Sequence, residues 1–376
     1  MKRAIVVFVL IFCLAFGGCY SYKGLDKMII VMGIALDYDE QSQKYLATLE
    51  IVDIPNSSEK EGIKNKMLEC EGVSIPDAFF NATKKIRSIL YFGSCEVLII
   101  CPGIAQKGLK TIIDTFVRTQ ELRETAFIMV SQEEKAGDLF KKAKGMTSAI
   151  ISMDIQQIME QGSMLSGTIK KVKMYQVYND LLSQKKCPSI PALHLTGNDQ
   201  EKVVEANGTA VFRIDKLKHY LTPEETIFLL LAINEYGGGS LMLDKDGDPA
   251  NDFCILVRKA ISDTSLKIEE DKPSFGIDIK LRAVLDESEL FNEKLKYEEL
   301  KQLEEDYARM IEEKVKNLLD KVQKEYNCDI VGFGEKVYRE NPKFWEKIKD
   351  KWFEIYADVK VDVKASVKIT NINITR

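Results

Sequence analysis

Residues 303–369 read LEEDYARMIEEKVKNLLDKVQKEYNCDIVGFGEKVYRENPKFWEKIKDKWFEIYADVKVDVKASVKI, and two periodicities within them predict the architecture of the C-terminal region. Apolar residues recur at helical spacing in the first half, which predicts a long helix from about 295 to 326. Every odd position over 355–369 is apolar, which predicts a long, half-buried, edge-type strand. Trp345 and Trp352 are spaced to share one face of a shorter helix between them. A long helix beside a long strand indicates an α+β domain.

Toward the N-terminus, short apolar segments alternate between strand and helix character. They are a hairpin of the runs from Met28 and Tyr45, a helix over Ile75–Leu90, a buried strand over Cys95–Cys101, a helix over Gly108–Thr119 and a strand from Ala126. The polar stretch Asn56–Gly72 predicts a loop. This order of elements, ββαβαβ, indicates a mixed α/β layer.

The middle of the chain changes from helical to extended patterns. Helical signals dominate Glu134–Lys186, and Pro188 and Pro191 end them. The segment Glu201–Tyr220 alternates like a hairpin, with Asn207-Gly208 as the turn signal. Thr222 is a predicted N-cap for a helix that runs to about Asn234. Three further strands are predicted at Phe253–Val257, Ser265–Glu269 and Gly276–Leu285.

The first eighteen residues have the pattern of a secretory leader. Lys2 and Arg3 precede an unbroken apolar run over Ala4–Phe16, which ends in Gly17-Gly18 before Cys19. Small residues directly before a cysteine resemble the bacterial lipobox, which predicts a diacylglyceryl group on the Cys19 thiol and cleavage before it. The alternative is an uncleaved anchor, because the apolar stretch, counted to Tyr20, approaches the roughly 17–25 residues that span a bilayer.

Together with the chain length, these patterns predict an α+β (mixed α/β) chain of two or three domains, each a β-sheet packed with helices. The expected parts are a lipoprotein signal peptide at 1–18, a lipid-anchored tether at 19–27, an N-terminal α/β region at 28–190, a middle domain at 191–250 and a C-terminal α+β domain at 251–376.

Charge argues against nucleic acid as a partner. The chain has 53 Lys and Arg against 58 Asp and Glu, a net charge of −5. Loss of Lys2 and Arg3 with the leader gives −5 − 2 = −7 for the mature chain. Such a body has no overall positive field for phosphates, and it would adhere to anionic lipid through its anchor rather than through basic patches.

The search for catalytic chemistry gives weak candidates. His194 and His219 are the only imidazoles, and the eight cysteines contain no Cys-x-x-Cys pair. Cys95 and Cys101 are expected to pack in an apolar strand. The run Asp244–Asp248 alternates carboxylates like a calcium loop, but the required Gly and Glu are missing. Acidic groups near Glu304 and Glu312 are expected to be solvated helix charge. We therefore expect no catalytic, metal or cofactor-binding residue and no cofactor.

Taken in order, these segments resemble a known family, the Ger(x)C lipoproteins, which are the C subunits of Ger-type nutrient germinant receptors. The segments that carry the resemblance are Cys19 followed by IIVMGIALD, then EGVSIPDAFFNATKKIRSILYFGSCEVLII, FVRTQELRETAFIMVSQ, NGTAVFRIDKLKHYLTPEETIFLLLAIN and the C-terminal stretch from Leu303. The resemblance implies a three-domain mixed α/β body on the outer face of the spore inner membrane, working with two integral membrane subunits, A and B, and without known catalytic residues.

Two functions from different classes follow. The first is a lipid-anchored, non-enzymatic receptor subunit that is required for germination signalling and for which small-molecule binding is not expected. The second is an extracytoplasmic solute-binding lipoprotein. That class needs repeated βα units in two lobes, whereas this chain predicts hairpins and an antiparallel C-terminal strand.

Overall fold

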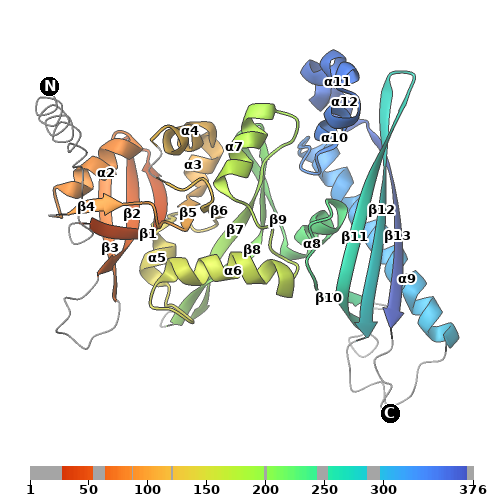
Figure 1. Ribbon diagram of the computed structural model, residues 1–376, viewed down its shortest axis with the longest axis horizontal. Helices are drawn as coiled ribbons and strands as arrows, with labels where there is room; N and C mark the ends of the chain where they lie inside the picture. Colours follow the sequence, from red (N-terminus) through yellow and green to blue (C-terminus); the bar gives the residue numbers. More distant parts are fainter. Residues whose placement is uncertain are drawn as a thin grey trace, which may run out of the picture.

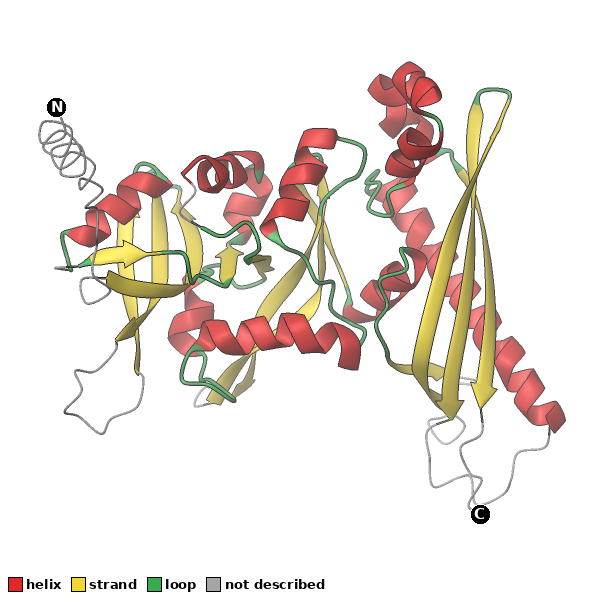
Figure 2. Cartoon of the chain, viewed as in Figure 1, coloured by secondary structure: helices red, strands yellow, loops and turns green. Residues whose placement is uncertain are grey.

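The computed structural model describes residues 28–53, 64–86, 88–119, 122–198, 201–243, 253–285 and 297–370. They form two β-sheets with their helices, side by side along the long axis of the molecule (Figures 1 and 2). We call the part built on the first sheet, 28–221, the first body, and 222–370 the second body. Each body has its own hydrophobic core. The mixed α/β class expected from the sequence is confirmed.

The first sheet has parallel strands in its centre and antiparallel strands at both edges. Its members are β1 (Met28–Asp39), β2 (Lys44–Asp53), β3 (Lys64–Gly72), β4 (Ile89–Tyr91), β5 (Val97–Ile100), β6 (Phe127–Ser131), β7 (Ser189–Asn198), β8 (Glu201–Arg213) and β9 (Lys216–Leu221). The order is β3-β2-β1-β5-β6-β7-β8-β9, with β4 paired to β1. The strands β1, β5, β6 and β7 run parallel. Every residue of β5 and β6 is buried, which for β5 confirms the prediction from its apolar sequence.

Six helices among the described residues cover this sheet. They are α2 (Ile75–Thr83), α3 (Pro102–Lys107), α4 (Lys110–Thr119), α5 (Gly137–Lys142), α6 (Ile151–Leu165) and α7 (Met174–Ser183). The helix α2 packs on β2 and β3. Its start is fixed by Ser74, whose side chain accepts a hydrogen bond from the Asp77 backbone N–H at 3.3 Å.

The second sheet contains two long strands from one hairpin and a long parallel strand at its edge. Its members are β10 (Gly239–Leu243), β11 (Phe253–Glu269), β12 (Lys272–Leu285) and β13 (Lys360–Thr370), in that order. The strand β13 pairs with β12 from Ser274↔Lys360 to Val284↔Thr370. Its buried residues, Val363, Val367 and Ile369, belong to the apolar alternation that the sequence shows.

Helices fill the remaining volume of the second body. After α8 (Pro223–Ala232) come the long α9 (Tyr297–Asp320), its π-helical continuation η3 (Lys321–Glu325), α10 (Phe333–Glu340), α11 (Pro342–Ile348), the 3-10 turn η4 (Lys349–Lys351) and α12 (Trp352–Ala357). The predicted stripe of α9 is buried at Leu303, Tyr307, Ile311, Val315 and Leu318. Trp345 and Trp352 lie in two helices, α11 and α12, rather than on one helix as predicted, and both are buried with ring centroids 5.5 Å apart.

The helix α8 joins the two bodies. Its cap is reciprocal: Thr222 Oγ1 accepts from the Glu225 N–H at 3.1 Å, and Glu225 Oε2 accepts from the Thr222 N–H at 2.9 Å. Residues Phe228–Ala232 are buried in the second core, and α8 also contacts β8 of the first sheet. The sequence predicted this helix correctly.

Two predictions in the first body are wrong. The helix predicted over Ile75–Leu90 ends at Thr83, and Ile89–Tyr91 form the short strand β4. The polar stretch that predicted a loop contains β3, whose residues Lys64–Gly72 pair with β2. An edge strand such as β3 needs backbone partners on one side only, so charged side chains are tolerated and hide its periodicity.

The turn of the β8–β9 hairpin also differs from the prediction. It lies at Ile214 and Asp215, because Arg213 pairs with Lys216. The Asn207-Gly208 pair lies inside β8 at a register shift opposite β7. Gly208 has φ +80°, and a Cβ there would lie 1.9 Å from the Leu221 carbonyl oxygen, so the glycine permits a bulge rather than a turn.

In the second body the strand predicted from Ile355 begins at Lys360, because Trp352–Ala357 are helical. This strand is parallel to β12, not antiparallel. The segments predicted as separate strands at Phe253–Val257 and Ser265–Glu269 are parts of the single strand β11. The predicted start of the long helix, Leu295, lies outside the described residues, and η3 extends the helix to Glu325.

The described residues form two sheets, so the expectation of three domains with one sheet each is not confirmed. The strands β7, β8 and β9 of the predicted middle domain continue the first sheet, since β7 pairs with β6. The strand β10 joins the second sheet by pairing with β11. The domain boundaries themselves stay predictions.

One buried carboxylate organises the helical end of the second core. Asp329 Oδ1 accepts from the N–H groups of Gly332 at 2.8 Å and Phe333 at 3.0 Å. Its Oδ2 accepts from the Gly334 N–H at 2.7 Å and from Trp352 Nε1 at 3.1 Å. Burial raises the pKa of Asp329, while these four donors oppose that effect.

We expect Asp329→Asn to lower the free energy of unfolding of the second body by about 2–4 kcal/mol, because the amide NH2 would face donors in place of one carboxylate oxygen. The measurement is urea unfolding followed by tryptophan fluorescence, since both tryptophans of the chain lie in this core. Asp350→Asn, at an exposed position, is the matched control and should change stability by less than about 0.5 kcal/mol. Equal midpoints for the two variants would contradict the assigned role.

Candidate functional sites

Two of the residue groups singled out from the sequence, Cys19 and Asp244–Asp248, lie outside the described residues. Across the described ranges, no three histidine, cysteine, aspartate or glutamate side chains gather as a metal site would require. Every described helix is too short or too polar to cross a bilayer. The candidate sites in the two bodies are therefore clusters of buried titratable groups.

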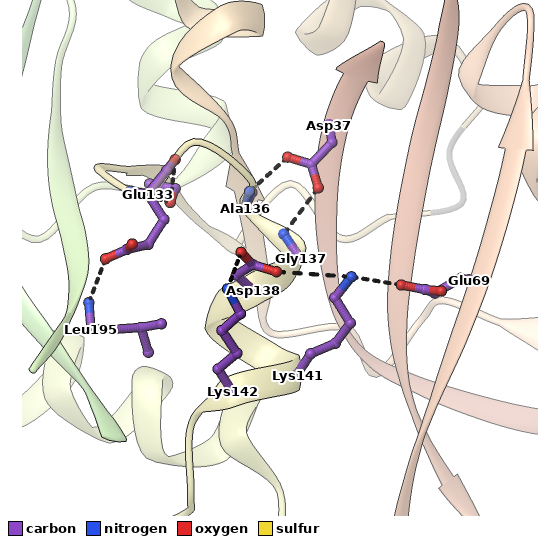
Figure 3. Close-up of polar contacts among 10 residues, drawn as sticks. Asp37, Glu69, Glu133, Ala136, Gly137, Asp138, Lys141, Lys142 and Leu195 are labelled. Carbon is purple, nitrogen blue, oxygen red and sulfur yellow. Dashed lines mark hydrogen bonds and ion pairs between the residues drawn. The ribbon is translucent and has the colours of Figure 1, made fainter. Parts of the chain in front are cut away.

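The first cluster joins the β1–β2 hairpin to α5 (Figure 3). The Asp37 carboxylate is buried and accepts from the N–H groups of Ala136 at 2.6 Å and Gly137 at 3.0 Å, at the start of α5. Burial raises the pKa of Asp37, and these two hydrogen bonds oppose the rise. Farther along α5, Lys141 Nζ lies 2.7 Å from Glu69 of β3. Both Asp37 oxygens are therefore occupied by the backbone, as in a structural cap.

The second cluster repeats this arrangement at α6. Glu50 is fully buried, and its carboxylate accepts from the N–H groups of Ile151 at 2.7 Å and Ser152 at 2.6 Å, and from the Ser152 hydroxyl. Asn65 Nδ2 donates to it at 2.7 Å. Gly33 pairs with Glu50 across the sheet, and a Cβ on Gly33 would lie 2.0 Å from Ser152 Oγ. The glycine thus lets α6 approach its capping carboxylate.

The two histidines occupy separate positions, His194 half-buried and His219 exposed. His194 Nε2 lies 3.3 Å from Glu205 Oε2 across the β7–β8 pair. The His219 ring stacks on Tyr326 with centroids 4.6 Å apart. One histidine thus has a surface carboxylate partner and the other a packing partner between the bodies, so the structure does not bring the two together.

The cysteines expected to pack are indeed buried. Cys95 is fully buried, and Cys101 is almost so. Burial raises the pKa of both thiols, which keeps them in the protonated, weakly nucleophilic form. Cys101 lies at the N-cap of α3, where its sulfur accepts from the Ile104 N–H at 3.4 Å. The prediction of a packing role for this pair is confirmed.

The acids on α9 include two that are not solvated charge, contrary to the prediction. Glu312 Oε1 accepts from the Ala365 backbone N–H at 2.9 Å, and Glu304 Oε1 accepts from the Ile369 N–H at 2.8 Å. Both amides belong to the edge strand β13, so these carboxylates cover part of its outer backbone. Glu305 and Glu313 are exposed as expected. The helical pattern alone could not separate Glu304 and Glu312 from Glu305 and Glu313, because the partner residues on β13 lie 53 and 65 residues further along the chain.

A third cluster, which the sequence analysis missed, lies in a crevice of about 260 Å3 between the bodies. Its charged lining consists of Lys170, Lys171, Asp180, Lys186, Glu235 and Glu335. Lys170 is only 5% exposed, and its Nζ donates to Ser189 Oγ at 2.8 Å. We call this site the Lys170 crevice. No local sequence signal marks it, because its residues come from three segments far apart in the chain.

Comparison with known proteins gives one family over most of the chain. Residues 21–195 match the model described as a spore germination protein N-terminal domain, and residues 207–373 match the model described as spore germination B3/GerAC like, C-terminal. The relatives include spore germination protein KC of Bacillus subtilis (strain 168), 23% identical over 98% of this chain and 95% of its own. Another is spore germination protein GerQC of Bacillus cereus, 23% identical over 100% of both chains.

A solved structure shares the fold. The crystal structure of the GerBC protein superposes with a TM-score of 0.61, covering 90% of this chain and 97% of that one, at 22% sequence identity. The likeness therefore extends over both bodies.

We expect Glu304→Ala and Glu312→Ala to accelerate amide hydrogen exchange in the β13 segment that contains Ala365 and Ile369. Each change removes a charge-assisted hydrogen bond worth about 1.5–3 kcal/mol, which corresponds to about tenfold to hundredfold faster exchange. Peptide-level mass spectrometry measures the effect. Glu305→Ala and Glu313→Ala, on the same helix, are the controls and should leave the rate unchanged. Equal rates in all four variants would show that the carboxylates do not protect the strand.

Proposed function

The chain belongs to the GerC-like family of spore germination proteins, and from this premise we propose that it is a lipid-anchored, non-enzymatic subunit of a nutrient germinant receptor. The observation that carries the proposal is the similarity to spore germination proteins along the whole chain, with matched lengths on both sides. The proposed partners are two integral membrane subunits, A and B, and the proposed place is the outer face of the spore inner membrane.

The proposed anchor is a diacylglyceryl group on Cys19, after cleavage of a signal peptide at 1–18. Two acyl chains hold a protein firmly, because each buried methylene contributes about 0.8 kcal/mol, whereas a single chain gives only marginal binding. From Cys19 to Met28, where β1 begins, is 28 − 19 = 9 residues. An extended chain covers at most about 3.3–3.6 Å per residue, so this tether keeps the start of β1 within about 30 Å of its anchor.

A non-enzymatic role is supported by what the buried acids do. Asp37, Glu50 and Asp329 each accept hydrogen bonds from the first N–H groups of a helix. Their oxygens are committed to the backbone, so they do not resemble a general acid or base poised for a substrate. The contribution of this subunit would then be assembly of the receptor and contact with its partners through the two bodies.

We expect Cys19→Ala to release the protein from the membrane fraction and to abolish the response of spores to nutrient. The measurement is membrane fractionation with immunoblotting, together with germination followed by loss of optical density. Cys13→Ala is the matched control, since it removes a thiol from the same leader and should leave retention unchanged. Undiminished retention of the Cys19 variant would refute the anchor, and a normal nutrient response would refute the need for it.

A further inference from the structure

The Lys170 crevice is formed by both bodies of the molecule. Lys170, Lys171 and Asp180 come from α7 and the segment before it, in the first body. Glu235 follows α8, and Glu335 lies in α10, both in the second body. Lys186 lies in the segment between α7 and β7 and packs near Gly332 at the start of α10. A group bound here would touch both bodies.

Lys170, which is buried, and Asp180, which is half-buried, both lack a direct partner of opposite sign. Lys170 Nζ donates to the Ser189 hydroxyl at 2.8 Å and the Ser189 carbonyl at 3.3 Å, which are both neutral. No ion pair joins Lys170 or Asp180 to another described residue, although each lies in the electrostatic field of the other. Buried charges are normally paired with a charge of opposite sign. Because the Lys170 ammonium and the Asp180 carboxylate line the same cavity without contacting each other, a charged ligand between them would pair with both.

We infer that the Lys170 crevice binds a small zwitterion, whose carboxylate meets Lys170 and Lys186 and whose ammonium meets Asp180 and the acids of the second body. The lining contains three lysines and three acids. A ligand with only one charge would pair with the lysines or with the acids and leave the other group without a partner. The amides of Gln176 and Asn179 add neutral donors and acceptors. The volume of about 260 Å3 far exceeds the roughly 10–15 Å3 that one water needs.

The protonation of the crevice defines when such a ligand would bind. Burial lowers the pKa of Lys170 to about 8, and burial raises the pKa of Asp180 to about 6. Lys186 also acts on both groups, as do Glu235 from beyond α8 and, for Asp180, Glu335 from α10. The ammonium is lost as the pH rises above the Lys170 value, and the carboxylate is lost as the pH falls below the Asp180 value. Affinity should therefore be highest between about pH 6 and 8.

The test is calorimetry with the detergent-purified full-length protein, in which lipid anchoring plays no part. The probes are glycine and β-alanine, two zwitterions that differ in the separation of their charges, with acetate and methylammonium as single-charge controls. We expect at least one zwitterion to bind at least tenfold more tightly than either single ion. Lys170→Met and Asp180→Asn should each weaken that binding at least tenfold. Lys280→Met and Asp278→Asn, an exposed pair on β12, are the matched controls and should leave it unchanged.

The wild-type protein alone also decides the question if a variant fails to fold. Its affinity for the better zwitterion should fall on both sides of the window, while glycine and β-alanine stay zwitterionic throughout it. Absence of binding by both zwitterions, binding of acetate as tight as that of the zwitterion, or an affinity independent of pH would each overturn the inference. The first outcome would mean that the crevice holds water only. Neither binding nor its absence changes the outcome expected for membrane retention of the Cys19→Ala variant.

Discussion

Buried carboxylates must be supplied with hydrogen-bond donors, and in this molecule the donors are the free N–H groups at the starts of helices. Asp37 meets α5, Glu50 meets α6 and Asp329 meets α10. Two of these acids lie on neighbouring strands of the first sheet, β1 and β2, so the sheet itself determines where α5 and α6 begin. The third lies in the loop before α10 and also holds the Trp352 ring. Without these acids, each helix would have unsatisfied donors in a dry interior.

The contact between the two bodies has an apolar side and a polar side. The apolar side is α8, whose apolar residues lie in the second core and whose Thr226 hydroxyl donates to the Thr209 hydroxyl of β8 at 3.0 Å. On the polar side, the segment before β7 meets α10, where Lys185 Nζ lies 3.1 Å from the centre of the Tyr338 ring. The Lys170 crevice lies on this polar side. Charged residues of both bodies therefore line one shared crevice.

The sequence predicted the elements whose burial pattern is complete and local. The apolar strand β5, the capped helix α8 and the stripe of α9 are such cases, because burial on a whole face leaves a periodic record. Prediction from the sequence failed where the structure of a segment depends on contacts with residues far away in the chain. The charged edge strand β3 is held by backbone pairing, and Gly208 permits a bulge that only the neighbouring strands require. Likewise, Glu304 and Glu312 resemble any surface acid until β13 is placed beside them, and the Lys170 crevice exists only once both bodies are assembled.

The late position of β13 in the chain bears on the order in which the protein can be built during synthesis. The first sheet has its complete set of described strands once Leu221 has been made, so the first body can close early. The second sheet receives its edge strand only after α9, α10, α11 and α12, so α9 can pack on α8, β10 and β11 before β13 has been made. A nascent chain therefore leaves the part of α9 that contacts β13 without this partner for the time needed to add some forty further residues, from Asp320 to Lys360. This interval is when a chaperone would have the most to protect.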